Sequence, residues 1–142
     1  MNKEIICTLT GTVGSAVAGM FGGWDAAIKT LVIFMTIDYI SGLTVAGVFK
    51  TSNKTKSGAL QSTAGWKGLC KKSMTLLFVL IAHRLDLILK TSYIRDAVVI
   101  GFLANELISI VENAGMMGLP IPGVVKRAIE VLREKGDKAN AN

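Results

Sequence analysis

The residues of this chain whose types could do chemistry are polar side chains set within apolar stretches. Asp38 lies near the middle of the apolar run 30–49. A carboxylate at the centre of a membrane helix costs about 2.5–3.5 kcal/mol on insertion scales, so we expect Asp38 to be paired, protonated or facing water. Ser41 and Gly42, three and four residues later, leave space beside it for a partner helix.

His83 and Asp86 share one face of a predicted helix, because residues three apart lie one turn along it. We expect a His83–Asp86 contact that holds the outer end of this helix, and the alternative is a proton-linked switch at His83. A zinc site is not expected, because the other ligands that it needs do not occur at a recognisable spacing.

Polar residues form a longer row on the segment 94–114. At about 100° per residue, five of them fit an arc of about 120°: Asn105, Glu106, Ser109, Glu112 and Asn113. Leucine, isoleucine and valine occupy the other side. A helix that is amphipathic at membrane depth needs water or polar partners along one face, so these side chains are predicted either to line a pore or to form a polar seam between helices.

Catalytic patterns are missing from the sequence. It has no glycine-rich phosphate loop after a strand, no nucleophile elbow and no HExxH motif. Cys7 and Cys70 have no metal-binding spacing, and we interpret them as free thiols. We therefore expect no enzymatic activity, no metal and no cofactor.

Composition and charge place these residues in a membrane. Apolar residues make up 51% of the 142, and the mean hydropathy is +0.50. Most of the net charge of +6 comes from the segment 50–72, which has no acidic residue and six lysines: Lys50, Lys54, Lys56, Lys67, Lys71 and Lys72. The positive-inside rule assigns such a segment to the cytoplasm, with anionic lipid headgroups rather than nucleic acid as its partner.

The predicted fold is an all-α integral membrane bundle of three to four transmembrane helices with a C-terminal amphipathic helix. Its parts are a marginal, glycine-rich helix 5–24, a helix 25–49, the cytoplasmic lysine-rich loop 50–72, helices 73–90 and 94–114, the amphipathic helix 122–135 and a tail 136–142. With the loop inside, the C-terminus is cytoplasmic for either number of spans.

The segment 5–24 decides the number of spans. It has no charged residue and is long enough to cross a bilayer, but its glycines and threonines make insertion only weakly favourable. Small residues recur every four positions, at Gly11, Ser15, Gly19 and Gly23, which predicts close packing against another helix. The alternative is a flexible, partly interfacial arm.

Several short motifs occur in an order that resembles the phage-lysis and toxin-secretion holin family. They are Asp38-Tyr39-Ile40-Ser41-Gly42, Gly65-Trp66-Lys67-Gly68 with Lys71-Lys72, Ala82-His83 with Asp86, Asn105-Glu106 through Glu112-Asn113, and Gly118-Leu119-Pro120-Ile121-Pro122. The resemblance covers about residues 31–135. It implies a small multi-pass protein of the bacterial cytoplasmic membrane that forms homo-oligomers and permeabilises the membrane, with an endolysin or a toxin as released cargo and an antiholin as a further partner. The alternatives are a small gated ion channel or transporter, and a non-lytic membrane scaffold or holin antagonist.

Overall fold

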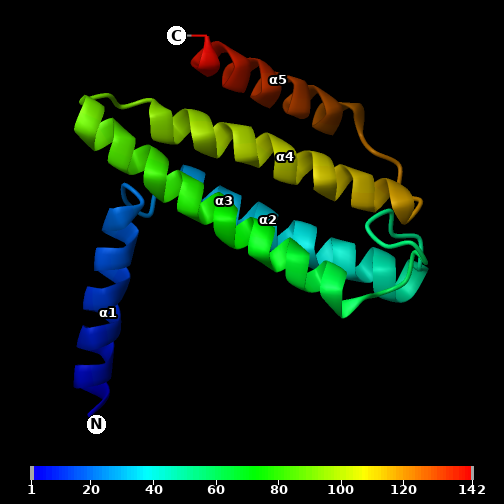
Figure 1. The fold of residues 1–142 in the computed structure, drawn as a ribbon, viewed down its shortest axis with the longest axis horizontal. Helices are drawn as coiled ribbons and strands as arrows, with labels where there is room; N and C mark the ends of the chain where they lie inside the picture. The colour runs from blue at the N-terminus through cyan, green and yellow to red at the C-terminus, as the bar shows by residue number, and fades with distance from the viewer. Residues whose placement is uncertain (1, 142) are drawn as a thin grey trace.

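The computed structural model describes residues 2–141, with side chains for 2–138 and 141, and this part contains helices and no strand. The helices are α1 (Lys3–Met20), α2 (Ala26–Thr44), the π-helical turn η1 (Val45–Phe49), α3 (Ser62–Leu89), α4 (Ile94–Met116) and α5 (Gly123–Asn140). Figure 1 shows α2, α3 and α4 side by side, α5 along α4, and α1 running away from the bundle. The predicted all-α class is confirmed.

Helix α2 is the most apolar element. The carboxylate of Asp25 caps its first turn by accepting a hydrogen bond from the Ile28 amide at 3.1 Å. The helix continues into η1 and ends at Lys50, whose left-handed backbone (φ 54°) breaks it. Among the described residues, Ala26–Phe49 is the one helical segment that is both long and apolar enough to cross a membrane.

The core lies between α2, α3 and α4, towards the end of the bundle that carries the α3–α4 turn. Large apolar side chains from all three helices meet there: Ile28, Leu31 and Met35 of α2, Val79 of α3, and Val99 and Leu103 of α4. This core fixes the three helices relative to one another, and polar residues occupy their other half.

Helix α3 begins at Ser62, well before the predicted start at residue 73. Lys67, Lys71 and Lys72 therefore lie on a helix rather than in the predicted loop. Two glycines in this first part sit against Tyr39 of α2, where a Cβ at Gly65 would lie 3.5 Å from its hydroxyl. Helix–helix packing at these positions outweighs the low helix propensity of glycine.

Helix α5 also extends further than predicted, through Gly136 to Asn140 instead of ending at residue 135. Its half-buried residues recur at helical spacing, at Val125, Ile129, Leu132 and Gly136, and this seam faces α4. Gly136 and Asp137 line a cavity together with Ala97 and Gly101 of α4, so the end of α5 lies beside the start of α4. Only part of the predicted apolar face is used, because Val124 and Val131 stay exposed.

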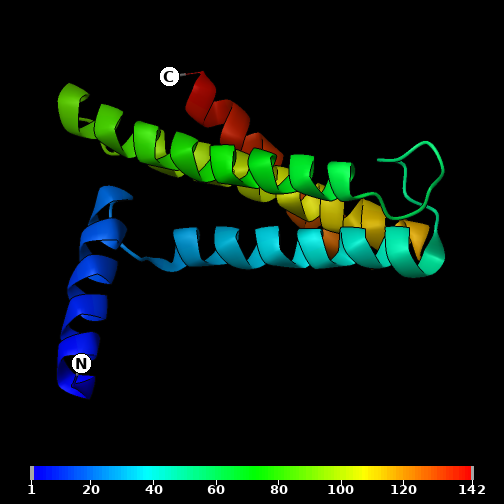
Figure 2. The ribbon, with the colours of Figure 1, turned by 60° about the horizontal axis from the view of Figure 1, so that its bottom comes forward.

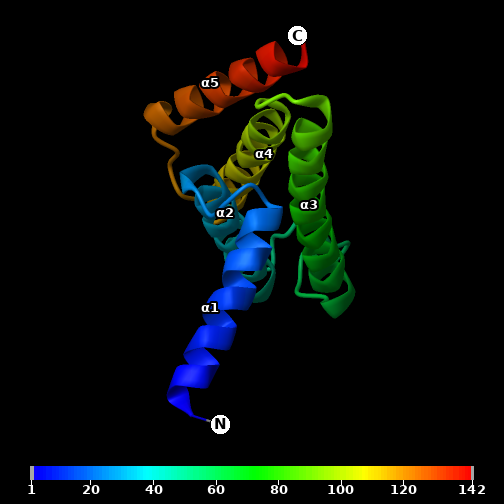
Figure 3. The same cartoon turned by 90° about the vertical axis from the view of Figure 1, so that its left-hand side faces the viewer.

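Helix α1 has no buried residue. It joins the bundle through Gly22 and Gly23, both with positive φ, and extends crosswise to α2 and α3 (Figures 2 and 3). A Cβ at Gly11 or Gly19 would meet nothing within 4 Å. The row of small residues therefore faces open space in a single chain, and its packing against another helix stays a prediction.

Candidate functional site

Three charged side chains meet in the half of the bundle nearest the lysine-rich loop. The ammonium group of Lys72 on α3 lies 2.7 Å from an oxygen of Asp38 on α2 and 2.5 Å from an oxygen of Glu106 on α4. The exposed fractions of the three side chains are between 8% and 13%. Of the outcomes expected for Asp38, the structure shows pairing.

An amide completes this group of residues. Asn113 of α4 is buried and donates hydrogen bonds to Oδ1 of Asp38 at 3.1 Å and to Oγ of Ser41 at 2.8 Å. Gly42 lies at the same contact, where a Cβ would be 3.7 Å from the Asn113 amide nitrogen, an ordinary van der Waals distance. We call Asp38, Ser41, Lys72, Glu106 and Asn113 the inner polar network.

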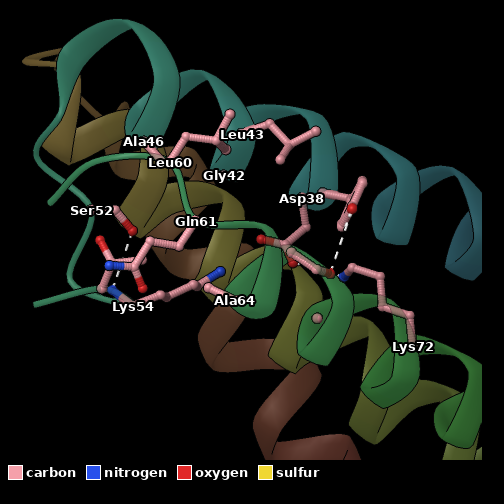
Figure 4. Close-up of a pocket in the computed structure, with 14 residues that line it drawn as sticks. Asp38, Gly42, Leu43, Ala46, Ser52, Lys54, Leu60, Gln61, Ala64 and Lys72 are labelled. Carbon is pink, nitrogen blue, oxygen red and sulfur yellow. Dashed lines mark hydrogen bonds and ion pairs between the residues drawn. The ribbon is translucent and has the colours of Figure 1, made fainter. Parts of the chain in front are cut away.

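The network holds two carboxylates and one ammonium group, so its own charge is −1. A second lysine, Lys54, extends from the loop towards Asp38 beside the Asp38–Lys72 pair (Figure 4). Charges removed from water are costly unless they are paired and hydrogen-bonded, and breaking such a pair leaves an uncompensated charge. The network therefore stabilises α2, α3 and α4 together only while Lys72 remains in place.

The residues of the predicted polar row of α4 differ in how deeply the structure buries them. Glu106 and Asn113 belong to the inner polar network, Ser109 is half-buried, and Asn105 and Glu112 are exposed. This arrangement is a polar seam between helices in a single chain. That these residues line a pore stays a prediction.

Asp86 has a different role from the one predicted. Its carboxylate accepts hydrogen bonds from the amides of Ile94 and Arg95 at 3.0 and 2.8 Å and from the hydroxyl of Thr91 at 2.6 Å. It thereby caps α4, in place of the predicted contact with His83. The amides at a helix start lack partners within the helix and attract a carboxylate, which explains the difference. His83 lies instead beside Gly22.

Arg95 ties the α1–α2 junction to α4. Its guanidinium is buried, forms a two-point pair with Asp25 at 2.9 and 3.2 Å, and donates to the carbonyl of Phe21. The hydrogen bond from Arg95 lowers the pKa of Asp25, which lies just outside α2.

Arg95 and the pairing role of Lys72 were not predicted from the sequence. Both side chains find their acidic partners on distant segments, at a sequence separation of 70 for Arg95–Asp25 and 34 for each Lys72 pair. No local spacing signals such a pair. The available hint was Asp38, whose cost at membrane depth demands a partner somewhere in the chain.

Comparison with known proteins assigns the family. Residues 15–134 match the bacteriophage holin family. The chain is 44% identical to an uncharacterized protein of Listeria innocua, over 88% of this chain and 85% of that protein. It is 34% identical to an uncharacterized protein of Clostridium perfringens, over 96% and 98% of the two chains, and 29% identical to a probable holin of Bacillus phage phi105, over 78% and 77%. No solved structure matches. The resemblance found in the sequence motifs is confirmed, and the chain belongs to the bacteriophage holin family.

Proposed function

We propose that this protein is a holin that assembles in the bacterial cytoplasmic membrane and permeabilises it to release an endolysin or a toxin. Family membership implies a membrane location and suggests a non-enzymatic role. The observation that carries the proposal is the inner polar network, which buries three charged groups in a bundle whose outer surface is rich in apolar side chains. Such groups in a membrane protein mark a pathway or a switch.

The proposed topology has three spans, α2, α3 and α4. The loop 50–61 and the end of α4 lie together at one end of the bundle, and the α1–α2 and α3–α4 junctions lie together at the other (Figure 1). The lysines favour a cytoplasmic position for the first end. The crosswise direction of α1 and its lack of buried residues favour an interfacial position outside the cytoplasm. The exposed charged residues of α5 resist translocation, which favours a cytoplasmic C-terminus. Because α5 lies back along α4 in the single chain, this topology requires α5 to leave α4 and to lie on the cytoplasmic side of the membrane.

The mechanism uses the same side chains in two arrangements. In the closed state the inner polar network keeps the charged groups of one chain against each other. When copies reach a critical density, the helices rearrange, and the polar faces of neighbouring copies surround water. Hydration then relieves the cost of burying charge, so opening is abrupt.

The test is timed expression in bacteria while membrane potential and the release of a cytoplasmic reporter protein are followed. Sudden collapse of the potential together with protein release supports a holin. Ion flux without protein release indicates the channel or transporter. Neither effect indicates a scaffold or a holin antagonist.

An Asp38→Asn variant links the outcome to the inner polar network. The amide keeps the shape of the side chain and loses its charge, so lysis should shift in time or fail at an equal protein level. Asp137→Asn is the matched control, since it removes a carboxylate from an exposed position on α5. Unchanged timing in Asp38→Asn would remove this residue from the mechanism.

A further inference from the structure

A cavity of about 480 Å³ opens between α3, α4 and the lysine-rich loop, beside the inner polar network. Asp38, Lys72 and Glu106 form part of its wall, and the cavity extends from them towards Lys54, Lys67 and Lys71. The network therefore has a polar, open side that faces the proposed cytoplasmic end of the bundle.

The charges around this cavity are not balanced. Four lysines and two carboxylates line it, which leaves a net charge of +2. Lys72 is already engaged by both carboxylates, so the other three lysines carry the excess. Lys67 and Lys71 are exposed, one turn apart on the same face of α3. The cavity is suited to an anion.

Along the same face of α3, the side chains change from charged to apolar within two turns. Lys67 and Lys71 are followed at helical spacing by Met74 and Phe78, whose side chains are 48% and 47% exposed. Lys71 and Phe78 are seven residues apart, which is about 10 Å along a helix. A row with ammonium groups at one end and exposed apolar side chains at the other matches the two parts of a phospholipid, its phosphate and its acyl chains.

The structure separates the six lysines of the segment 50–72 into distinct groups. Lys72 belongs to the inner polar network, while Lys54, Lys67 and Lys71 surround the cavity. Lys50 and Lys56 are exposed and do not line it. If the attraction to anionic lipid is diffuse, all exposed lysines contribute to binding equally. If the lipid binds at a specific site, only the lysines around the cavity contribute.

We propose that this cavity binds the phosphate of an anionic phospholipid through Lys54, Lys67 and Lys71, with the acyl chains along Met74 and Phe78. The proposal rests on the membrane location of the proposed function but not on lysis. Lipid bound here lies against the outer side of the Lys72 pairs.

The test measures lipid binding to the full chain in neutral detergent by native mass spectrometry. The probes are phosphatidylglycerol, phosphatidylcholine and inorganic phosphate. The site variant is Lys67→Gln/Lys71→Gln, and the control is Lys50→Gln/Lys56→Gln, which removes the same charge from the same side of the membrane. Circular dichroism checks that both double variants keep the parent's helix content. If Lys67→Gln/Lys71→Gln does not, Lys71→Gln alone replaces it as the site variant.

The parent should bind phosphatidylglycerol in preference to phosphatidylcholine. The site variant should bind phosphatidylglycerol about thirtyfold more weakly, since each lysine near an anionic headgroup contributes about 1 kcal/mol. The control should stay within about twofold of the parent.

Equal losses in the two double variants would overturn the site, because the attraction would then be diffuse. Displacement of the lipid by inorganic phosphate at equal concentration would overturn the assignment to a phospholipid. A chain that binds the lipid at this site but does not lyse cells would keep the site and lose the proposed function.

Discussion

Lys72 is the residue on which the inner polar network depends most. Among the residues that the structure describes, it is the one cation that bridges the carboxylates of α2 and α4, at 2.7 and 2.5 Å, and its side chain is 13% exposed. Without it, the carboxylates of Asp38 and Glu106 lie near each other with no cation between them. The neighbouring Lys71, by contrast, is exposed.

Replacing Lys72 with Met should destabilise the protein by about 3–5 kcal/mol, the range measured when one partner of a buried pair is removed. Asp38→Asn should cost less, because Lys72 keeps Glu106 and the new amide keeps hydrogen-bonding capacity. Chemical unfolding in detergent, followed by circular dichroism, measures both. Lys71→Met is the control for the loss of a lysine at the same depth, and an equal effect of the two substitutions would contradict the pairing role.

Adding Glu106→Gln to Lys72→Met should recover part of the lost stability, since it removes one of the two uncompensated carboxylates. If the double variant is no more stable than Lys72→Met, repulsion between the carboxylates is not the cause of the loss.

For individual residues, the sequence predicted correctly which polar groups need a partner, but it predicted the partners themselves less well. Asp38, Glu106 and Asn113 were selected because polar groups at membrane depth are costly, and all three are hydrogen-bonded in the structure. The prediction failed for Asp86, because the amides of the next helix compete better for its carboxylate than His83 does.

Among the elements, α1 has few contacts with the bundle, and none of its residues is buried. Its predicted helical character is correct, and the helix ends at Met20, before the two glycines. In the bundle, the predicted starts of α2, α4 and α5 agree with the structure to within one residue, whereas α3 begins 11 residues earlier than predicted. The residues 62–72 are too polar to resemble a membrane span, yet they form the first part of α3, where Gly65 and Gly68 lie against Tyr39.

Two glycines at the end of α1 should respond differently to substitution. Gly22 has φ +83° and a Cβ there would lie 2.8 Å from Nδ1 of His83, so Gly22→Ala should lower the free energy of unfolding by about 1–3 kcal/mol. A Cβ at Gly19 meets nothing, so Gly19→Leu should leave the stability of the single chain unchanged.

Any effect of Gly19→Leu should therefore appear between copies. If the row of small residues packs against α1 of another chain, leucine prevents the close approach and lowers the yield of crosslinked oligomers. Crosslinking in membranes measures this yield, while unfolding in detergent measures the stability. Normal oligomers and normal lysis timing in Gly19→Leu would exclude a packing role for this row.

In the molecule as a whole, polar and apolar side chains are distributed as a membrane protein requires. Asp38, Lys72, Glu106 and Asn113 lie inside the bundle, while its exterior carries large apolar residues that include Ile33, Ile37 and Ile40 of α2 and Leu77, Ile81 and Leu85 of α3. Hydropathy and helical period predicted costly polar groups on α2 and α4, but they assigned Lys72 to the loop rather than to the interior of the bundle. They carry no information on how α5 folds back, because its apolar face fits a lipid surface and α4 equally well.

The closed arrangement makes a specific prediction about which surfaces become wet on opening. Ser109 is half-buried next to the inner polar network, and Ala104 is buried on another side of α4. If the polar face of α4 meets water in the open state, a cysteine at Ser109 should react with a membrane-impermeant thiol reagent only after triggering. A cysteine at Ala104 should remain protected throughout, because this side of α4 faces α5 or lipid rather than the polar face. Both substitutions change little in size, and because the side chain of Ser109 interacts with Asp38, unfolding in detergent checks that each cysteine variant keeps the parent's stability.

The experiment replaces Cys7 and Cys70 with Ser, since both are exposed and would react. Labelling in cells before and after collapse of the membrane potential gives the comparison for each position. Asn105 and Glu112, which are already exposed in the single chain, should gain less on triggering than Ser109 does. Labelling that rises equally at Ser109 and Ala104 would mean that the helix unfolds or leaves the bundle altogether. No labelling at Ser109 after collapse would show that the polar row remains a seam between helices and that the hole is lined by another surface.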